Sequence, residues 1–354
     1  MDIKKIDYLY KKKRMKTITE LLKDISLLPD TERQMLIQEI NKGLGSTTNS
    51  IEHLVEVRHD IQEQEKFSCP YCGGEKIVGH GNYKGRKRYK CKSCEKTFND
   101  LTGTSVAHLH KKTEWQIYLK CVAQSMTIRA SAKKAGVSYR TAFMWRHKII
   151  SAFKDIGCVK LDGIVESDET FFLFSEKGNK NITGRKPRKR KGKASKAGIN
   201  DEHVAVIVSA DRNHKHPIAE VAGRGRVSTK KVEGVIGKWL GEEASVLCTD
   251  SHKSYGGFAK QHGLKHVKIN ASKGQFVKDK VYHIQNINGM HSLLKDWMKK
   301  FKGGVASGYL QNYLNWFRVI RTVGDNLVDY LTFALMSKNA FIPIKNIKPQ
   351  YIIS

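Results

Sequence analysis

Four cysteines of this sequence stand in two pairs whose spacing is typical of a metal site. Cys69 and Cys72 enclose two residues, 18 residues follow, and Cys91 and Cys94 repeat the pair. Each Cys-x-x-Cys turn presents two thiolates, so two turns complete a tetrahedron around Zn²⁺. Because four thiolates leave no open position for water, we predict a structural zinc ribbon here. The alternative is a set of free thiols with a packing role.

Carboxylates interrupt two apolar stretches that otherwise predict buried strands. Asp168 lies in the middle of GIVESDETFFLF, and Asp250 ends SVLCTD. A carboxylate in such a place is costly unless it is paired or binds a metal. Asn288 and Lys295 are seven residues apart on a predicted helix and therefore share one face. Two Mg²⁺ ions held by carboxylates are the usual means of phosphodiester chemistry, so Asp168 and Asp250 are candidate magnesium ligands.

Other titratable side chains lie close to these positions in the sequence. Strand alternation places Asp168 and Glu169 on opposite faces. Glu169 and Asp279 are possible additional carboxylate ligands, although the sequence offers no geometric argument for either. His283 and His291 flank the polar helix positions, either as further ligands or as ordinary hydrogen-bonded residues.

The periodicity of the second half predicts strands interleaved with helices. Residues 163–174, 203–210 and 245–250 are rich in β-branched and aromatic residues and predict strands. Helical spacing follows in Ser228–Leu240, Ile284–Phe301 and Ala306–Val319. This alternation is typical of a mixed α/β domain with a covered sheet.

Residues 127–149 have the pattern of a helix-turn-helix. Thr113 and Gln116 match a capping box, which predicts a helix start before this segment. Gly136 supplies the turn and Ser138 caps the second helix, whose core face carries Ala142, Trp145 and Ile149. An ordinary helical pair would show the same signals. In a DNA-reading pair the opposite face would enter the major groove, with Arg140, Thr141, Met144, His147 and Lys148.

The charge of the chain favours a polyanionic partner. The 354 residues contain 64 Lys and Arg against 34 Asp and Glu, a formal net charge of +30. Nucleic acid is the commonest partner of such a field. Between the cysteine pairs a basic hairpin is predicted, and its Arg86 and Arg88 are candidate phosphate contacts or simply parts of a solvated strand.

The segment between the first two predicted strands is strongly basic. From Glu176 to Ile199 it holds ten Lys and Arg and one Glu. With almost no apolar residues it is expected to stay solvated and disordered in the free protein. Arg188 and Arg190 are candidate phosphate contacts once DNA is bound.

Several classes of protein are disfavoured. The start has no apolar core of a secretory signal, and no apolar run approaches the length of a membrane span. Seven cysteines, four of them in the paired motif, indicate metal binding in a reducing cytosol rather than a disulfide framework. We therefore expect a cytoplasmic, nucleoid-associated protein with no membrane partner.

Taken together, these motifs resemble one family. CPYCGG, CKSCEKTF, VESDETFF, TDSHKSYGGF and HIQNINGMHSLLK make the chain similar to bacterial insertion-sequence transposases of the RNase H-like superfamily, in the ISXO-like branch with a zinc ribbon, over roughly residues 60–320. The resemblance implies the catalytic set Asp168, Asp250, Asn288 and Lys295. Asn288 stands where the superfamily usually has Glu, and its neutral oxygen should bind metal more weakly.

The resemblance also implies the reaction and the partners. Water would attack the phosphodiester at each end of the element, and the freed 3′-hydroxyl would attack target DNA, with two Mg²⁺ or Mn²⁺ ions as cofactors and no covalent protein–DNA link. Lys295 would bind phosphate near the scissile bond, or be an ordinary solvated lysine. The ribbon and helix-turn-helix would bind terminal inverted repeats in double-stranded DNA, as a homodimer or higher oligomer. The alternative is a decayed or domesticated DNA-binding protein without catalysis, which the substitution at Asn288 favours.

The expected organisation has five parts. Residues 1–60 form a helical region, 61–105 the zinc ribbon and 106–157 an all-α helix-turn-helix domain. Residues 158–320 form an α/β, RNase H-like catalytic domain with a mixed sheet and a basic insertion at 175–200. Residues 321–354 form a helical extension.

Overall fold

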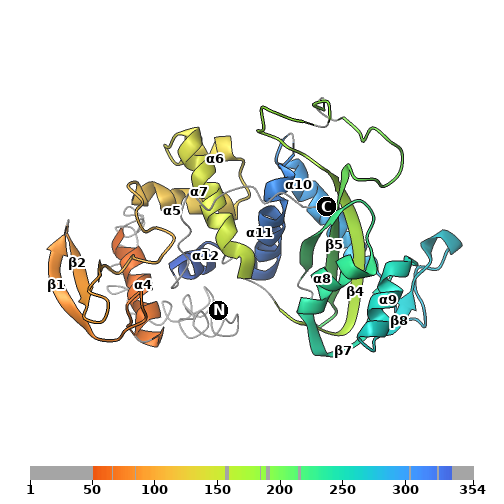
Figure 1. Cartoon of the computed structure of the whole chain (residues 1–354), viewed down its shortest axis with the longest axis horizontal. Coiled ribbons are helices and arrows are strands. Elements are labelled where there is room, and N and C mark those ends of the chain that lie inside the picture. The colour runs from red at the N-terminus through yellow and green to blue at the C-terminus, as the bar shows by residue number, and fades with distance from the viewer. Residues whose placement is uncertain are drawn as a thin grey trace, which may run out of the picture. The chain divides into compact units, whose positions relative to one another are not determined.

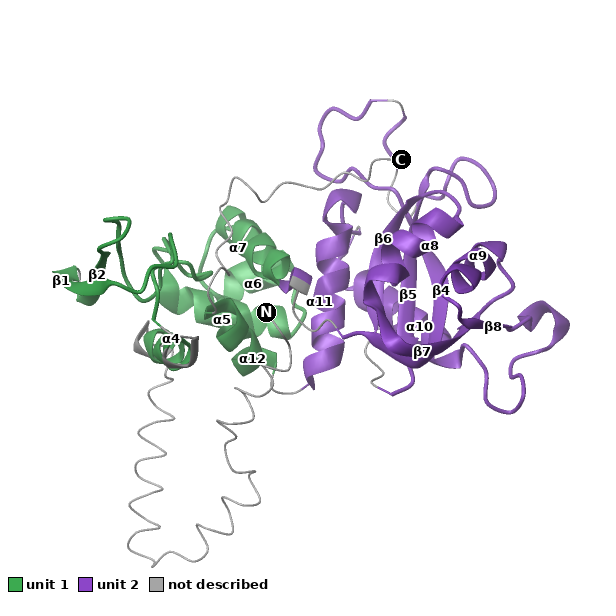
Figure 2. Cartoon of the chain, turned by 60° about the horizontal axis from the view of Figure 1, so that its bottom comes forward, with its two compact units in different colours: residues 1–152, 326–343 green, residues 153–325, 344–354 purple. Residues whose placement is uncertain are grey.

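The computed structural model describes residues 51–336 except 66, 84, 156–158, 184, 189–191, 214–216, 303 and 325–326. The helices predicted within residues 1–50, the candidate contact Arg190 and the end of the predicted C-terminal extension lie outside the described residues. The chain separates into two compact units, residues 1–152 with 326–343 and residues 153–325 with 344–354 (Figure 2). No described helix combines the length and apolar character needed to span a membrane.

The first unit combines a small sheet with helices. Strands β1 (Ile77–Tyr83), β2 (Arg86–Cys91) and β3 (Thr97–Phe98) form an antiparallel sheet, which confirms the predicted hairpin (Figure 1). Phe67, Tyr89 and Phe98 pack beside three of the paired cysteines. Helix α4 (Ile51–Glu65) packs on α12 (Leu327–Met336), which in turn packs on α5 (Lys112–Ala123).

Three helices of the first unit pack together, and the last two form the helix-turn-helix predicted at residues 127–149. They are α5, α6 (Ile128–Lys134) and α7 (Tyr139–Ser151), and Trp145 of α7 packs edge-on against Trp115 and Tyr118 of α5. Gly136 adopts a φ of 63° in the turn, a conformation that glycine favours. Thr127 and Ser138 cap α6 and α7 through their side chains. The capping box at Thr113 was wrong: α5 begins at Lys112, after Lys111, which makes no side-chain cap.

The second unit is built on a five-stranded mixed sheet. Its order is β6 (Ile218–Arg224), β5 (His203–Asp211), β4 (Leu161–Leu173), β7 (Leu240–Thr249) and β8 (Lys265–Lys268). The pairs β4–β5 and β5–β6 are antiparallel, whereas β4–β7 and β7–β8 are parallel. Three antiparallel strands followed by two parallel strands beside the first form an RNase H-like sheet, so the predicted fold class is confirmed.

Helices cover both faces of this sheet (Figure 1). Helices α8 (Thr229–Ile236) and α9 (Lys253–Gln261) pack on the face that carries Val165 and Ile207. On the opposite face α10 (Gln285–Lys299) contacts β4 and β5, and α11 (Leu310–Val323) contacts β6. Trp297 of α10 packs edge-on against Trp316 of α11, which joins these two helices. Because β4 is the central strand, its side chains contact helices on both sides.

The cap of α7 gives a first prediction. The Ser138 hydroxyl accepts a hydrogen bond from the Thr141 amide at 3.1 Å. Replacement of an N-cap Ser by Ala costs roughly 1 kcal/mol, whereas Gly costs a few tenths. We expect Ser138→Ala to lower the free energy of unfolding of the first unit by about 1 kcal/mol. Thermal unfolding followed by circular dichroism checks this with Ser138→Gly as control, and equal losses in both variants would contradict the capping role.

Candidate active site and nucleic-acid interface

Three carboxylates meet where β4 passes the end of β7. In the parallel β4–β7 pair Glu166 lies opposite Cys248, so two residues further on Asp168 is beside the point where Asp250 follows the strand. One carboxylate oxygen from each of Asp168, Glu169 and Asp250 lies within 4.8 Å of the others. The two aspartates predicted from separate strands are thus brought together.

Glu169 belongs to this group although strand alternation places it on the opposite face of β4 from Asp168. Its carboxylate accepts a hydrogen bond from the Tyr255 hydroxyl of α9 at 3.0 Å. Asp250 is held as well, because its Oδ1 accepts the His252 amide at 2.8 Å. Asp279, the other additional carboxylate considered from the sequence, is not in the group found among the described residues.

Burial and mutual repulsion govern the electrostatics of the group. Burial raises the pKa of Asp168 to about 7, and the charges of Glu169 and Asp250 add to this shift. Burial also raises the pKa of Glu169, against the opposing effect of the Tyr255 hydroxyl. The Tyr255 pKa is raised well above its usual value by burial and by Glu169. A cluster that resists holding three negative charges is a place where a cation is stabilised.

Helix α10 carries the remaining predicted site residues. His291 Nδ1 lies 3.7 Å from Asp168 Oδ2, and burial lowers the pKa of this histidine to about 4. The Lys295 charge acts on both groups, since it lowers the pKa of Asp168 and of His291. Asn288 is exposed on the same helix, and its role as a ligand stays a prediction. His283 contacts Glu166 rather than the three-carboxylate group.

The four paired cysteines also converge. Cys69 Sγ and Cys94 Sγ are 3.6 Å apart, Cys72 Sγ and Cys91 Sγ are 3.7 Å apart, and all four sulfurs lie within 4.8 Å. In the first turn the Cys69 amide donates to the Gly74 carbonyl and the Gly73 amide to the Cys69 carbonyl, each at 2.9 Å. In the second turn the Cys94 amide lowers the pKa of Cys91 to about 6. This donor set fits a tetrahedral Zn²⁺.

The start of α7 presents the side chains that a DNA groove could reach. Arg140 is exposed and Thr141 is partly exposed. Tyr139 beside them is 54% exposed, and Arg129 of α6 lies 5.9 Å from the centre of its ring. The N-terminal residues of a recognition helix are the usual base-reading positions, so this location agrees with the predicted role of Arg140 and Thr141.

Two other predicted contacts on α7 require correction. His147 is 1% exposed and Lys148 is 4% exposed, so neither side chain is on the surface. Lys148 Nζ points to the Ala107 carbonyl at 3.5 Å. Burial lowers the pKa of His147 to about 3 and that of Lys148 to about 8. The prediction put both opposite Trp145, which helical spacing supports for His147 only. Lys148 follows Trp145 by three residues and so lies close to the same face, where the chain around residue 107 covers it.

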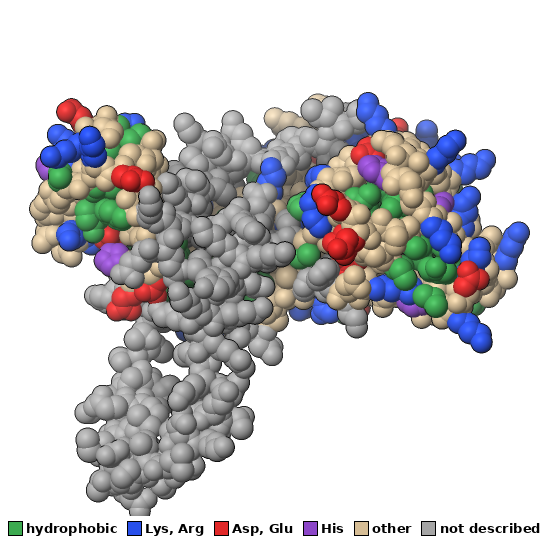
Figure 3. Space-filling model, turned by 90° about the horizontal axis from the view of Figure 1, so that it is seen from below, with side chains coloured by type: hydrophobic (Ala, Val, Ile, Leu, Met, Phe, Trp, Pro, Cys, Tyr) green, Lys and Arg blue, Asp and Glu red, His purple; other side chains and the backbone are tan. Residues whose placement is uncertain are grey.

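The two arginines of the ribbon hairpin are only partly exposed to solvent. Arg86 and Arg88 are both half-buried on β2. Arg88 donates to the Thr97 hydroxyl at 3.1 Å and lies 5.9 Å from the centre of the Tyr83 ring. Their predicted phosphate contacts are left untested by this arrangement. On the face drawn in Figure 3, Lys and Arg side chains are spread over the described surface, with smaller groups of Asp and Glu among them.

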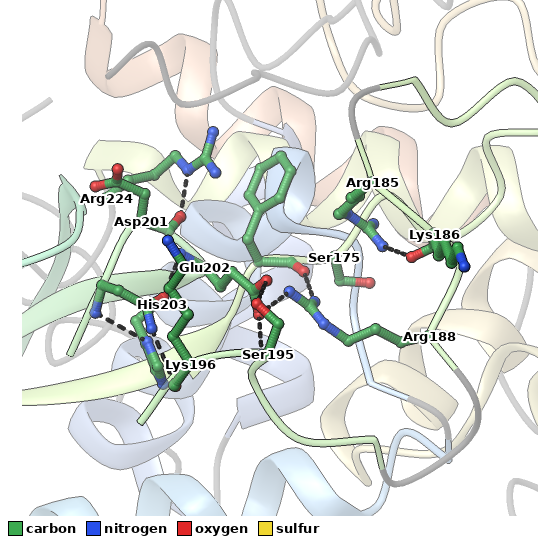
Figure 4. Close-up of polar contacts among 12 residues, drawn as sticks. Ser175, Arg185, Lys186, Arg188, Ser195, Lys196, Asp201, Glu202, His203 and Arg224 are labelled. Carbon is green, nitrogen blue, oxygen red and sulfur yellow. Dashed lines mark hydrogen bonds and ion pairs between the residues drawn. The ribbon is translucent and has the colours of Figure 1, made fainter. Parts of the chain in front are cut away.

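Hydrogen bonds connect the basic insertion to Glu202, the residue immediately before β5. Glu202 accepts hydrogen bonds from the Ser195 amide at 2.8 Å, the Ser195 hydroxyl at 2.6 Å and Arg188 at 3.0 Å (Figure 4). Arg188 also donates to the Phe174 carbonyl. The two Ser195 contacts with Glu202, followed by Arg188, lower the pKa of Glu202 to about 2. The prediction of a wholly disordered loop is therefore wrong for this part, since Glu202 at its base gathers donors that composition alone does not reveal.

Burial of Lys148 gives a second prediction. Its pKa of about 8 lies below the ordinary 10.5. Below pH 8 the buried charge therefore lowers the free energy of unfolding, and this loss disappears as the pH rises towards 10.5. We expect Lys148→Met to raise the free energy of unfolding by up to about 3 kcal/mol below pH 8, with the gain shrinking between pH 8 and 10.5. Urea unfolding at several pH values measures this, with the exposed Lys133→Met as control. A loss of stability that is the same at every pH would contradict the assignment.

Comparisons with known proteins agree with the site. Residues 160–318 match the family model described as the ISXO2-like transposase domain. A curated relative from Halobacterium salinarum, described as an uncharacterized protein in transposable element ISH50, is 26% identical over 263 residues, which cover 72% of this chain and 85% of the relative.

Solved structures of the Mos1 transposition complexes also align with the chain. The pre-cleavage Mos1 transpososome covers 62% of this chain and 78% of its own, with 12% identity and a TM-score of 0.20. The Mos1 strand transfer complex covers 61% and 75%, with 10% identity and a TM-score of 0.20. The likeness to this family rests on the domain match, the curated relative and the sequence motifs. Residues 160–318 are therefore similar to the ISXO2-like transposase domain of insertion-sequence transposases.

Proposed function

We propose that this protein is a transposase that cuts and joins DNA at the three-carboxylate group. The observation that carries the proposal is the convergence of Asp168, Glu169 and Asp250 within 4.8 Å inside the matched domain. Hydrolysis at each end of the insertion sequence would free a 3′-hydroxyl, which then attacks a target phosphodiester. Neither step requires a covalent link between protein and DNA.

The carboxylates fit a pair of divalent cations. Asp168, Asp250 and Glu169 would hold them, and the Asn288 amide oxygen would complete the set from α10. The raised pKa of Asp168 supports this, because the cluster is short of positive charge. When bound, Mg²⁺ or Mn²⁺ activates the attacking oxygen and stabilises the leaving one.

The protein side chains have distinct tasks in this reaction. The Tyr255 hydroxyl holds Glu169 in place, and the His252 amide holds Asp250. Lys295 adds positive charge beside Asp168 and would neutralise the scissile phosphate. His291 is buried, lies 3.7 Å from Asp168 Oδ2 and has a pKa lowered to about 4, so it would face the carboxylate as a neutral ring.

DNA recognition would use the first unit and the basic insertion. Arg140 and Thr141 would read base edges of the terminal inverted repeats, while Arg86 and Arg88 would contact phosphate beside them. Within the insertion, Arg188 shapes the chain through Glu202, and exposed lysines such as Lys193 and Lys196 would meet the DNA backbone. Holding two ends together calls for a homodimer or higher oligomer, working at the nucleoid in the cytoplasm.

A second candidate is a DNA-binding protein that has lost catalysis. The specific observation in its favour is Asn288, a neutral residue at a position where the superfamily usually has Glu. It predicts binding to the inverted repeats without joining.

Strand transfer decides between these functions. Full-length protein, Mn²⁺ or Mg²⁺, a pre-cut duplex with the element's end and a plasmid target should give joined product. We expect Asp168→Asn, Asp250→Asn and Glu169→Gln each to reduce joining about a hundredfold or more, without loss of thermal stability, because each removes a repelling charge. Glu242→Gln, an exposed acid on β7, is the matched control.

The variants of the third position complete this experiment. Loss of joining in Asn288→Ala places its amide in the metal site. Binding without joining in the wild type, with joining gained in Asn288→Glu, would instead establish the decayed enzyme.

Zinc content tests the ribbon separately. We expect about one zinc per purified chain, because four thiolates form one tetrahedral site. Cys91→Ser should lose this zinc and weaken binding to the inverted repeat, whereas Cys121→Ser, a buried cysteine on α5 outside the group, should keep it. Metal analysis by mass spectrometry gives the answer, and full zinc occupancy in Cys91→Ser would contradict the assignment.

A further inference from the structure

Glu166 is a buried carboxylate that the proposed chemistry does not use. It lies on β4 two residues before Asp168, on the same face, and is 1% exposed. Its Oε1 accepts from Arg212 Nε at 3.1 Å and from Asn286 Nδ2 at 2.8 Å. His283 Nδ1 lies 3.4 Å from the same oxygen. Glu166 thus gathers donors from the end of β5 and from both sides of the start of α10.

If the role of Glu166 were only to fill space, a buried carboxylate would cost more free energy than an apolar side chain. Oε2 of Glu166 is buried and has no hydrogen-bond partner among the described residues. Two residues earlier on the same face, Ile164 packs against the apolar cluster that contains Ile284. An apolar contact therefore already joins β4 to the segment before α10, and a well-packed apolar residue often replaces a buried ion pair without loss of stability. A buried ion pair kept beside it calls for a role other than packing.

The contacts along β4 show what this role is. From Ile164 to Glu166 to Asp168, the strand meets successively the apolar cluster that contains Ile284, then Asn286 and then His291. Helix α10 therefore runs along β4, and Glu166 is the hydrogen-bonded link at its first turn. If a helix shifts by one residue, its side chains move by about 1.5 Å along the axis and turn by about 100°. Such a shift would take His291 and Lys295 away from Asp168.

We propose that Glu166 is a positioning residue that sets the register of α10 on β4 and so places Asn288, His291 and Lys295 over the three carboxylates. The Arg212 guanidinium supports the carboxylate from the β5 side, where it also donates to the Val281 carbonyl at 2.6 Å. The proposal rests on the proposed function for its effect on joining. Its effects on α10 and on metal binding do not depend on DNA.

Two variants of the full-length protein test this. Glu166→Gln keeps the shape and removes the charge, and Glu166→Met with Arg212→Met replaces the ion pair by apolar side chains. We expect faster amide hydrogen exchange in residues 285–292 and Mn²⁺ affinity, measured by titration calorimetry without DNA, lowered about tenfold or more in both. The kcat of strand transfer should fall about tenfold, with an unchanged KM for the end duplex. The double variant should keep the wild-type Tm.

A matched control lies on the edge strand β6 of the same sheet. Glu220 is another buried carboxylate, and it accepts a hydrogen bond from Trp239 Nε1 at 2.7 Å. Glu220→Gln should leave exchange in α10 and Mn²⁺ affinity as in the wild type.

The outcomes separate this proposal from the function itself. Exchange and Mn²⁺ affinity within twofold of the wild type in both Glu166 variants would overturn the positioning role, whatever happens to Tm. A wild type that binds Mn²⁺ but never joins DNA contradicts the proposed function alone, since the α10 and metal results still decide the role of Glu166. A wild type that binds no Mn²⁺ overturns both.

Discussion

Repulsion among three carboxylates on and beside one central strand is the constraint around which the second unit is built. Asp168, Glu169 and Asp250 lie within 4.8 Å, and burial with mutual repulsion brings the pKa of Asp168 to about 7. A metal-free site of this kind keeps a proton that a divalent cation would displace. The surrounding contacts hold the repelling groups together: Tyr255 binds Glu169, an amide binds Asp250, and Lys295 acts on Asp168.

The sheet makes this convergence possible because β4 is supported from both faces. Glu169 points towards the α9 side, where Tyr255 comes from the apolar cluster of α8 and α9. Asp168 points towards α10, whose first turn is linked to β4 through Glu166. Where the neighbouring strand β7 ends, Asp250 stands beyond it and can meet side chains from both faces. A site at a strand end therefore draws on two helical layers at once.

The sequence predicted much of this arrangement, and its failures have physical causes. Periodicity located β4, β5, β7, α8, α10 and α11, although Leu240, predicted to end a helix, begins β7. Carboxylates in apolar strands pointed to Asp168 and Asp250. Alternation placed Glu169 on the opposite face of β4 from Asp168. It describes the face from which a side chain starts, but it does not show that the Glu169 carboxylate reaches Asp250, which follows the neighbouring strand β7. The prediction likewise left Lys148 on a free face, although a residue three positions after Trp145 lies close to the buried face of the helix, and the chain near Ala107 covers it. The sequence does not indicate a role for Glu202, because its hydrogen-bond partners lie within a segment whose composition predicts no packing.

The position of Glu169 changes how Asn288 should be understood. If the third ligand were Glu at residue 288, a fourth carboxylate would join a group whose burial and mutual repulsion already raise the pKa of Asp168. With Glu169 supplying the third negative charge, the neutral amide of Asn288, in its proposed role, would add a ligand oxygen without adding repulsion. Three carboxylates carry a charge of −3 against +4 for two divalent cations, and the phosphate of bound DNA supplies the remaining negative charge. On this charge balance, asparagine at position 288 is compatible with an active enzyme and is no sign of decay by itself.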